Sequence, residues 1–234
     1  MKKNNLAGLM FVAPLVLLFL VMNVYPIIYN LVISGTDWNG IAKSWNFIGL
    51  QNYGKLMSNP VMPKVLRNFA VFGIATILTQ AALGVLLASF FARGVKGAGI
   101  YRTVFYVPVI ATATIVGNIF SKILETNRGY LNEMFRAVGL NGLAQPWLAE
   151  PNLALLWIIL INIWQWTGYS RLMYYANMLN IPRDVYEAAT IDGANARQQF
   201  CRITLPILRS THFTLFELGA LGSLKGFDLP YVLT

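Results

Sequence analysis

Three residues in the middle of one apolar stretch combine polar and aromatic chemistry on a single helical face. Asn162, Trp166 and Tyr169 stand at positions i, i+4 and i+7, which lie on one side of an α-helix. An amide, an indole and a phenol can together hydrogen-bond hydroxyl groups and stack on the apolar face of a pyranose ring. The alternative is structural, because Trp and Tyr also gather at membrane interfaces and amides also join helices.

Other reactive residue types are scarce. One cysteine, Cys201, excludes an internal disulfide and a cysteine-based metal site, and one histidine, His212, cannot build a histidine cluster. The sequence contains no Walker lysine motif, no G-x-S-x-G motif and no paired carboxylates at a useful spacing within an apolar stretch. We therefore expect a protein that is not an enzyme, with no metal site and no cofactor.

Two ionisable residues, Glu217 and Arg171, fall within or beside apolar stretches. Charged side chains in a membrane are costly and usually face a bundle interior or water. Either residue could line a pathway, or the two could pair with each other or with another subunit. A lone acid could also indicate proton coupling, which would favour a secondary transporter.

A polar segment at about residues 180–206 separates two apolar stretches and carries the most specific pattern in the chain. Asp184 and Glu187 suit the start of a helix, where the helix dipole favours negative charge. Asp192 and Gly193 form a turn signal and a helix stop. A second short helix is expected at about residues 194–203, limited by Pro206. Two short helices joined at a glycine would form a compact projection from the membrane.

The spacing in this segment is E-A-A, three residues, Gly, nine residues, then I-x-L-P. It resembles the cytoplasmic coupling loop of permease subunits of binding-protein-dependent ABC importers. A long gapped match of this kind is far more specific than a lone short motif. The resemblance implies that eight residues couple the permease to an ATPase: Glu187, Ala188, Ala189, Asp192, Gly193, Ile203, Leu205 and Pro206.

Weaker matches extend the resemblance to maltose-type sugar permeases over nearly the whole chain. The string Phe47-Ile48-Gly49-Leu50-Gln51-Asn52-Tyr53 is similar to a segment that follows the first span in that subfamily. In those permeases the sugar contacts the helix that here carries Asn162, 25 residues before Glu187. The resemblance implies that Asn162 lines the substrate pathway. We expect Trp166 and Tyr169 there because they share its helical face, and Glu217 because an acid within a span usually faces a bundle interior or water.

Composition and hydropathy agree with a membrane protein. The chain is 56% hydrophobic and 12% charged, with a mean hydropathy of +0.55. Charge-free stretches long enough to supply the roughly 20 residues of a membrane span lie within four ranges: 4–36, 68–92, 103–121 and 151–170. A fifth, at about 207–224, is interrupted by Glu217. Pro14 and Pro26 are expected to kink the first span.

Basic residues predict the orientation. The short, dense connection that contains Arg93, Lys96 and Arg102 should be cytoplasmic, and so should the N-terminus and the loop at 180–206. Connections at about 34–66 and 125–150 should face outward. The net charge of +9 follows from this topology, so nucleic acid need not be invoked. We expect the protein in the bacterial cytoplasmic (inner) membrane.

The sequence therefore predicts an all-α, polytopic transmembrane helix bundle, with one permease domain over residues 1–234. Five spans are visible, and permeases of this family usually continue with a sixth, so we expect a fragment. The resemblance implies carbohydrate import together with a second homologous permease, two cytoplasmic ATP-binding subunits and an extracytoplasmic sugar-binding protein. The alternatives are an ABC permease for another small solute and an ion-coupled secondary transporter.

Overall fold

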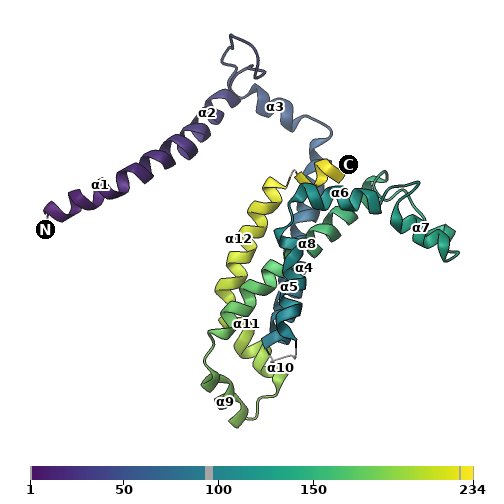
Figure 1. Cartoon of the computed structure of the whole chain (residues 1–234). Helices are drawn as coiled ribbons and strands as arrows, with labels where there is room; N and C mark the ends of the chain where they lie inside the picture. Colours follow the sequence, from purple (N-terminus) through teal and green to yellow (C-terminus); the bar gives the residue numbers. More distant parts are fainter. Residues whose placement is uncertain (1, 93–96, 227, 234) are drawn as a thin grey trace. The chain divides into compact units, whose positions relative to one another are not determined.

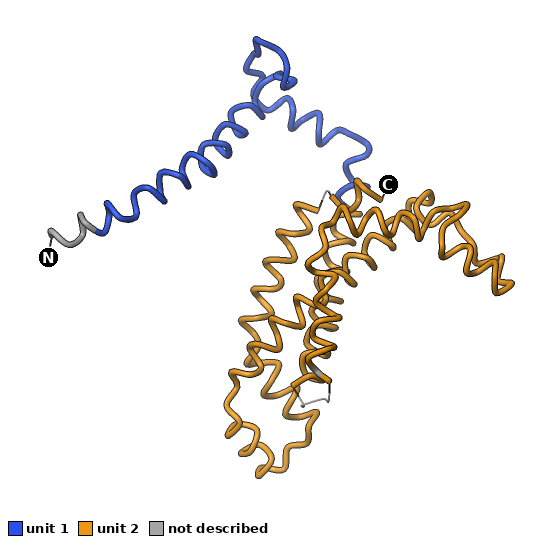
Figure 2. Tube along the Cα trace, viewed as in Figure 1, with its two compact units in different colours: residues 1–66 blue, residues 67–234 orange. Residues whose placement is uncertain are grey.

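The computed structural model describes residues 2–92, 97–226 and 228–233, and the regular structure within these ranges is helical. An isolated antiparallel bridge joins Thr36 and Phe47. The all-α prediction is therefore confirmed for the described residues. The chain divides into two compact units, Met1–Leu66 and Arg67–Thr234, which Figure 2 colours separately.

The first unit contains a long apolar helix whose winding changes part-way. α1 (Lys2–Phe19) continues through Pro14 into a π-helical turn, η1 (Leu20–Val24), and then into α2 (Tyr25–Ser34). Pro26 accounts for the wider turn, because proline lacks an N–H and its ring crowds the carbonyl four residues earlier. None of the most apolar window of this span is buried within the structure, so its surface suits lipid or another subunit.

A loop closed by polar contacts follows α2 and leads to α3 (Gln51–Met57). The carboxylate of Asp37 accepts hydrogen bonds from the backbone and the side-chain amide of Asn46, at 2.6 and 3.1 Å. These bonds, the backbone one foremost, hold the pKa of Asp37 below its ordinary value because they stabilise the charged form. Asn52 of α3 donates to the carbonyls of Ser34 and Thr36.

The second unit is built around α8 (Pro151–Leu179), the most enclosed of the long helices described. In the most apolar part of α8, 39% of the residues are buried, compared with 22% in the corresponding part of α4 (Met62–Ala92). α5 (Ala98–Ile110) and α12 (Arg209–Lys225) pack on α8, and all four helices can be followed in Figure 1. Six buried residues form the core between α4, α8 and the start of α12: Val85, Ala88, Tyr174, Met178, Leu208 and Leu215.

Small residues allow these helices to approach closely, as is common in membrane bundles. A Cβ atom on Gly168 of α8 would lie 1.8 Å from the carbonyl oxygen of Phe105 on α5. A glycine is therefore required where these two helices touch.

The third predicted span is not one straight helix. α5 ends at Ile110, and α6 (Ala113–Ile123) leaves the break at an angle of 95°. Pro108 weakens the last turn of α5 by removing a backbone donor. Thr112 then caps α6, with its hydroxyl oxygen accepting the N–H of Ile115 at 3.3 Å. The span predicted within 103–121 is therefore a bent pair of helices, because these two local signals interrupt the helix within an apolar stretch.

The other predicted spans correspond to helices in the described ranges. Three of these helices are long and apolar enough to cross a membrane, at Gly8–Ser34, Met62–Ala92 and Pro151–Leu179, and the bent pair could add a fourth. The fifth, α12, has 17 residues. At about 1.5 Å per residue it is roughly 26 Å long, slightly less than a hydrocarbon core of about 30 Å.

A second core closes the end of the unit where α6 meets α13 (Asp228–Leu233). The connection between α6 and α8 contains α7 (Tyr130–Ala137) and a short 3-10 turn, η2 (Asn141–Leu143). Asn132 fixes this connection, since it is 1% exposed and its side-chain oxygen accepts from the indole of Trp147 at 2.7 Å. The buried members of this core are Val116, Leu124, Ile158, Ile161, Leu229 and Leu233.

Candidate functional site

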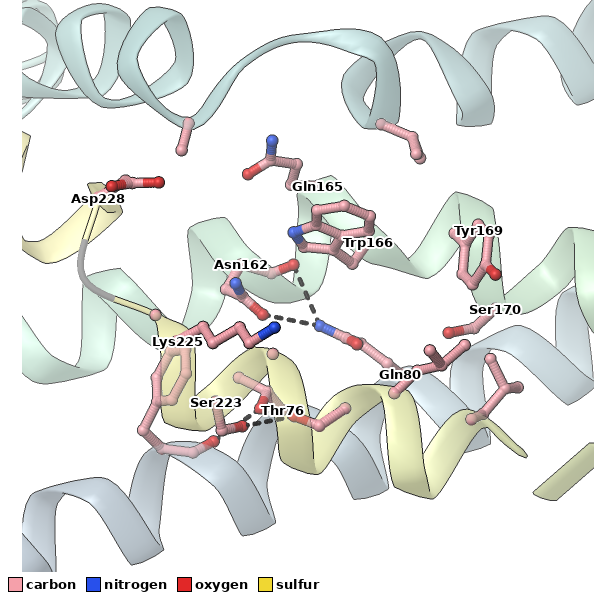
Figure 3. A pocket seen from close by; sticks show the side chains of 18 of the residues that line it. Thr76, Gln80, Asn162, Gln165, Trp166, Tyr169, Ser170, Ser223, Lys225 and Asp228 are labelled. Carbon is pink, nitrogen blue, oxygen red and sulfur yellow. Dashed lines mark hydrogen bonds between the residues drawn. The ribbon is translucent and has the colours of Figure 1, made fainter. Parts of the chain in front are cut away.

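A cavity of about 490 Å³ lies among the helices of the second unit. Its walls come from α4, α8 and α12, from the bend between α5 and α6, and from the start of α13 (Figure 3). The polar side chains in its lining are predominantly neutral: Thr76, Gln80, Thr112, Asn162, Gln165, Trp166, Tyr169, Ser170 and Ser223, with Lys225 and Asp228 carrying charge.

The predicted stripe on α8 faces this cavity. Asn162, Trp166 and Tyr169 all line it, and the rings of Trp166 and Tyr169 meet edge to face with centroids 6.3 Å apart. Figure 3 shows the three side chains rising from one helix toward the same space. The arrangement offers an amide, two aromatic faces and a phenol to a molecule in the cavity, chemistry that suits a polyhydroxylated ligand.

The bend between α5 and α6 supplies one wall of the cavity. Gln165 of α8, only 3% exposed, donates its side-chain N–H to the carbonyl oxygen of Ala111 at 3.0 Å. The bend frees that carbonyl from helical pairing, and an unpaired carbonyl at membrane depth would be costly. Irregular backbone is tolerated inside a bundle where it lines a cavity and its polar groups are satisfied.

Gln80 of α4 is a cavity residue that the sequence analysis did not select. Its side-chain N–H groups donate to the Asn162 side-chain oxygen at 2.9 Å and to the Asn162 backbone carbonyl at 3.2 Å. Both contacts are drawn in Figure 3. An amide inside an otherwise apolar span was a signal that could have identified it.

Glu217 and Arg171, the ionisable residues singled out from the sequence, lie outside the cavity lining. Glu217 is exposed on α12. Arg171 is 1% exposed, donates to the Arg102 carbonyl at 3.3 Å and lies over the ring of Phe91 at 5.5 Å. In the part of the chain that the structure describes, no salt bridge joins Arg171 to Glu217. Two nitrogens of the Arg171 guanidinium, Nε and Nη1, have no hydrogen-bond partner there.

Arg102 lies next to Arg171 and repeats the pattern of a cation held by aromatic groups. Its guanidinium stacks over the ring of Tyr175 at 4.4 Å and donates to the Tyr175 hydroxyl. Two cations thus meet on α5 and α8 without a carboxylate bonded to either among the described residues. Arg93 and Lys96, which entered the orientation argument, lie outside the described residues.

The polar segment at 180–206 folds into two short helices, as predicted. α9 (Arg183–Ile191) has Asp192 as its C-cap and is followed by Gly193, whose φ of +79° is left-handed. The Gly193 N–H bonds to the Thr190 carbonyl and the Ala194 N–H to the Ala189 carbonyl, which is a Schellman cap. α10 (Ala196–Gln199) begins with a capping box between Asn195 and Gln198. Pro182 precedes α9 as its N-cap.

A second π-helical turn, η3 (Phe200–Thr204), joins α10 to α11 (Leu205–Ile207) and the helices beyond. As in the first unit, a proline follows two residues after the turn, here Pro206. The Tyr186 hydroxyl bonds to the Thr204 hydroxyl at 2.9 Å, so α9 and η3 are tied together.

The residues predicted to couple this segment to a partner differ in exposure. Glu187, Ala188, Asp192, Gly193 and Pro206 are exposed, and Ala189, Ile203 and Leu205 are half-buried. Phe200 and Leu205 pack against the core of the second unit, whereas Arg197 and Arg202 are exposed. The segment therefore presents one face outward and anchors the other on the bundle.

Comparisons with known proteins identify the family of the chain. Residues 80–234 match the model of a family described as the binding-protein-dependent transport system inner membrane component. The chain belongs to this family. It is a multi-pass inner membrane component of an ABC-type transport system, and its role is transport rather than catalysis.

Individual relatives cover most of the chain. The probable ABC transporter permease protein YurN of Bacillus subtilis is 32% identical over 99% of this chain and 80% of its own length. The lactose transport system permease protein LacF of Rhizobium radiobacter is 30% identical over 97% of this chain and 76% of its own. The crystal structure of a bacterial ABC transporter that imports alginate shares the fold, with a TM-score of 0.80 and 22% identity over 99% of this chain and 81% of that one.

Proposed function

We propose that this chain is the permease subunit of an ABC importer that moves a carbohydrate through the cavity beside α8. The observation that carries the proposal is the lining of that cavity, in which neutral hydrogen-bonding groups and the Trp166 and Tyr169 rings surround about 490 Å³. A pyranose has hydroxyls at its rim and an apolar face. The hydroxyls match the hydrogen-bonding side chains of the cavity, and the apolar face matches the two aromatic rings. Relatives named for lactose, arabinooligosaccharide and diacetylchitobiose uptake support the same substrate class.

The remaining parts of the importer follow from the same proposal. The chain acts as one transmembrane domain beside a second homologous permease, two cytoplasmic ATP-binding subunits and an extracytoplasmic sugar-binding protein. A related alginate importer has been crystallised with its substrate-bound periplasmic protein, which supports the last of these partners. Binding of ATP elsewhere would shift the bundle between inward-facing and outward-facing states.

The coupling role belongs to the segment at 180–206. Glu187, Ala188, Ala189, Asp192, Gly193, Ile203, Leu205 and Pro206 are proposed to form and support the surface that docks on the ATPase. We propose that this segment and the N-terminus are cytoplasmic, a proposal supported by the basic residues around the segment and the positive-inside rule. Glu217 is proposed to lie along the substrate pathway, facing outward from this chain toward a neighbouring subunit.

Uptake measurements test the proposal directly. The complete importer, reconstituted in proteoliposomes with its binding protein, should take up a radiolabelled sugar when ATP is enclosed with the ATPase subunits. Calorimetry on the cognate binding protein should detect a carbohydrate ligand. Tight binding of an amino acid, peptide or metal ion by that protein, with no sugar uptake by the importer, would refute carbohydrate transport.

A further inference from the structure

Gln80 and Asn162 form the best-defined polar contact in the cavity. They are 82 residues apart in sequence, on α4 and α8, and two hydrogen bonds join them at 2.9 and 3.2 Å. Both side chains are partly buried and both line the cavity (Figure 3). The contact therefore links two helices and also restrains the orientation of the Asn162 side chain in the candidate site.

The geometry fixes which end of each amide faces the other. A backbone carbonyl can only accept a hydrogen bond, so the Gln80 atom that lies 3.2 Å from the Asn162 carbonyl must be the donor Nε2. Because Nε2 is a donor, the Asn162 atom that lies 2.9 Å from it must be the acceptor Oδ1. The Asn162 backbone carbonyl thus sets the orientation of the Gln80 amide, and the Gln80 amide sets the orientation of the Asn162 side-chain amide.

One polar atom of each side chain is left for the cavity. Among the described residues, neither Nδ2 of Asn162 nor Oε1 of Gln80 has a protein hydrogen-bond partner. Both groups line a space that can hold a ligand. The pair therefore offers one donor and one acceptor, a pattern that matches two neighbouring hydroxyl groups.

We propose that Gln80 is a positioning residue that holds the Asn162 amide with its Nδ2 donor directed to the sugar. The inference rests on the proposed carbohydrate function and adds a specificity element on a second helix. Without Gln80 the Asn162 amide could rotate by half a turn and exchange its donor for an acceptor. The site would then no longer favour an oxygen acceptor of the substrate at this position.

Variants of Gln80 separate positioning from packing. Gln80→Met keeps the length of the side chain and removes both donors, whereas Gln80→Glu keeps the shape and supplies at most one donor. Each is combined with Asn162→Ala in a double-mutant cycle. The matched control is Asn177→Leu, because Asn177 is an amide on the same helix that bonds to Met173 in its own helix, away from the cavity.

The experiment measures sugar uptake and ATP hydrolysis on the same proteoliposomes, prepared from the complete importer. The probes are radiolabelled lactose, arabinobiose and diacetylchitobiose. Thermal unfolding of each purified complex provides the measure of stability. The number of sugar molecules moved per ATP hydrolysed is the decisive quantity, because a residue that merely braces two helices would change uptake and hydrolysis together.

We expect Gln80→Met to reduce uptake about tenfold, the factor that corresponds to one hydrogen bond of about 1.4 kcal/mol, with ATP hydrolysis within about twofold of wild type. Gln80→Glu should give an intermediate loss. In the Asn162→Ala background Gln80→Met should have little further effect, since there is no amide left to orient. Asn177→Leu should leave the transport ratio unchanged.

Three results would overturn the inference. Additive losses from Gln80→Met and Asn162→Ala would show that the two amides act separately, while sugar uptake by the wild type would leave the proposed function intact. A parallel fall in uptake, hydrolysis and thermal stability, shared by Gln80→Glu, would make Gln80 a structural brace. If the wild type transports none of the sugars, the proposed function fails and the positioning role fails with it.

Discussion

At the scale of single residues, the second unit contrasts two ways of handling polar groups inside a bundle. The amide side chains each have a well-placed partner, as in Gln165 with the Ala111 carbonyl and Gln80 with Asn162. Arg171 is treated differently, because it is 1% exposed and has a single hydrogen bond at 3.3 Å. A satisfied amide can serve a site with little energetic penalty, whereas a poorly compensated buried cation destabilises the fold.

The cavity stripe gives the first prediction. Asn162→Ala and Trp166→Ala should each weaken transport roughly tenfold or more, because losing a hydrogen bond or a stacking surface at a buried site costs about 1–3 kcal/mol. Uptake of radiolabelled sugar by the reconstituted importer measures the effect, and ATP hydrolysis should continue. Trp164→Ala is the control, since Trp164 meets the ring of Phe120 edge to face and does not line the cavity. Normal uptake by Asn162→Ala would move the sugar site elsewhere.

Arg171 gives the second prediction. Replacing a poorly compensated buried charge with an apolar side chain of similar length is often stabilising, by about 1–4 kcal/mol for well-studied ion pairs. We therefore expect Arg171→Met to unfold at the same temperature as the wild-type complex in detergent, or at a higher one. Arg102→Met, which loses the stacking contact with Tyr175, should unfold at a lower temperature. A marked loss of stability in Arg171→Met alone would mean that this cation has a strong partner in the assembled protein.

At the scale of helices and loops, the elements that could be predicted from sequence are those with local causes. The turn at Gly193 depends on a glycine and its neighbours, so the spacing alone located it. The bend at 111–112 was equally local, with Pro108 and Thr112 as signals, but the apolar composition of the stretch masked them. Gln80 could not be assigned its role, because its partner lies 82 residues away and becomes a neighbour only when α4 and α8 pack.

The contact between α5 and α8 gives the third prediction. Gly168→Ala adds one methyl group that would lie 1.8 Å from the Phe105 carbonyl oxygen, so the helices must separate. Overpacking of this kind typically costs about 1–3 kcal/mol. Thermal unfolding should detect the loss, while Gly54→Ala in α3, where a Cβ has no neighbour within 4 Å, should be tolerated. Equal stability of the two variants would contradict the close approach.

The turn of the coupling segment gives the fourth prediction. Gly193→Pro should abolish transport without preventing membrane insertion, because proline fixes φ near −65° and removes the N–H that bonds to Thr190. Gly193→Asn is the matched control, since asparagine adopts left-handed φ at modest cost. Glu187→Lys should also abolish transport by reversing a charge on the proposed docking surface. Sugar-stimulated ATP hydrolysis at the wild-type rate in both Gly193→Pro and Glu187→Lys would remove the coupling role from this segment.

At the scale of the whole molecule, helices with exposed apolar surfaces fit a subunit made to be surrounded by lipid and other chains. The sequence predicted this well, because hydropathy depends on composition and needs no knowledge of contacts. It could not supply the side-chain arrangement of the cavity, which depends on five segments meeting in space. Orientation is a property of the same scale, and Cys201 offers a direct probe because it is exposed and unpaired.

Topology gives the fifth prediction. A membrane-impermeant maleimide should label Cys201 in inverted vesicles and not in intact cells, because the basic residues around the coupling segment favour the cytoplasmic side. A Cys201→Ser, Ser44→Cys variant provides the opposite case, since Ser44 is an exposed residue of the loop expected to face outward. Each variant should be tested with and without the ATPase subunits, which could shield Cys201. Labelling of Cys201 from outside intact cells would reverse the orientation and the coupling proposal with it.

The π-helical turn at Phe200–Thr204 has a consequence for the angular phase of the chain. Each residue of a helix rotates the side-chain direction by about 100° about the helix axis. One extra residue in a widened turn therefore rotates the side chains that follow the turn relative to those that precede it. Here the turn lies between α10 and α12. The number of residues in this turn therefore sets the direction in which the coupling segment at 180–206 faces relative to α12. Deleting one residue from this turn should leave both helices intact but turned out of register.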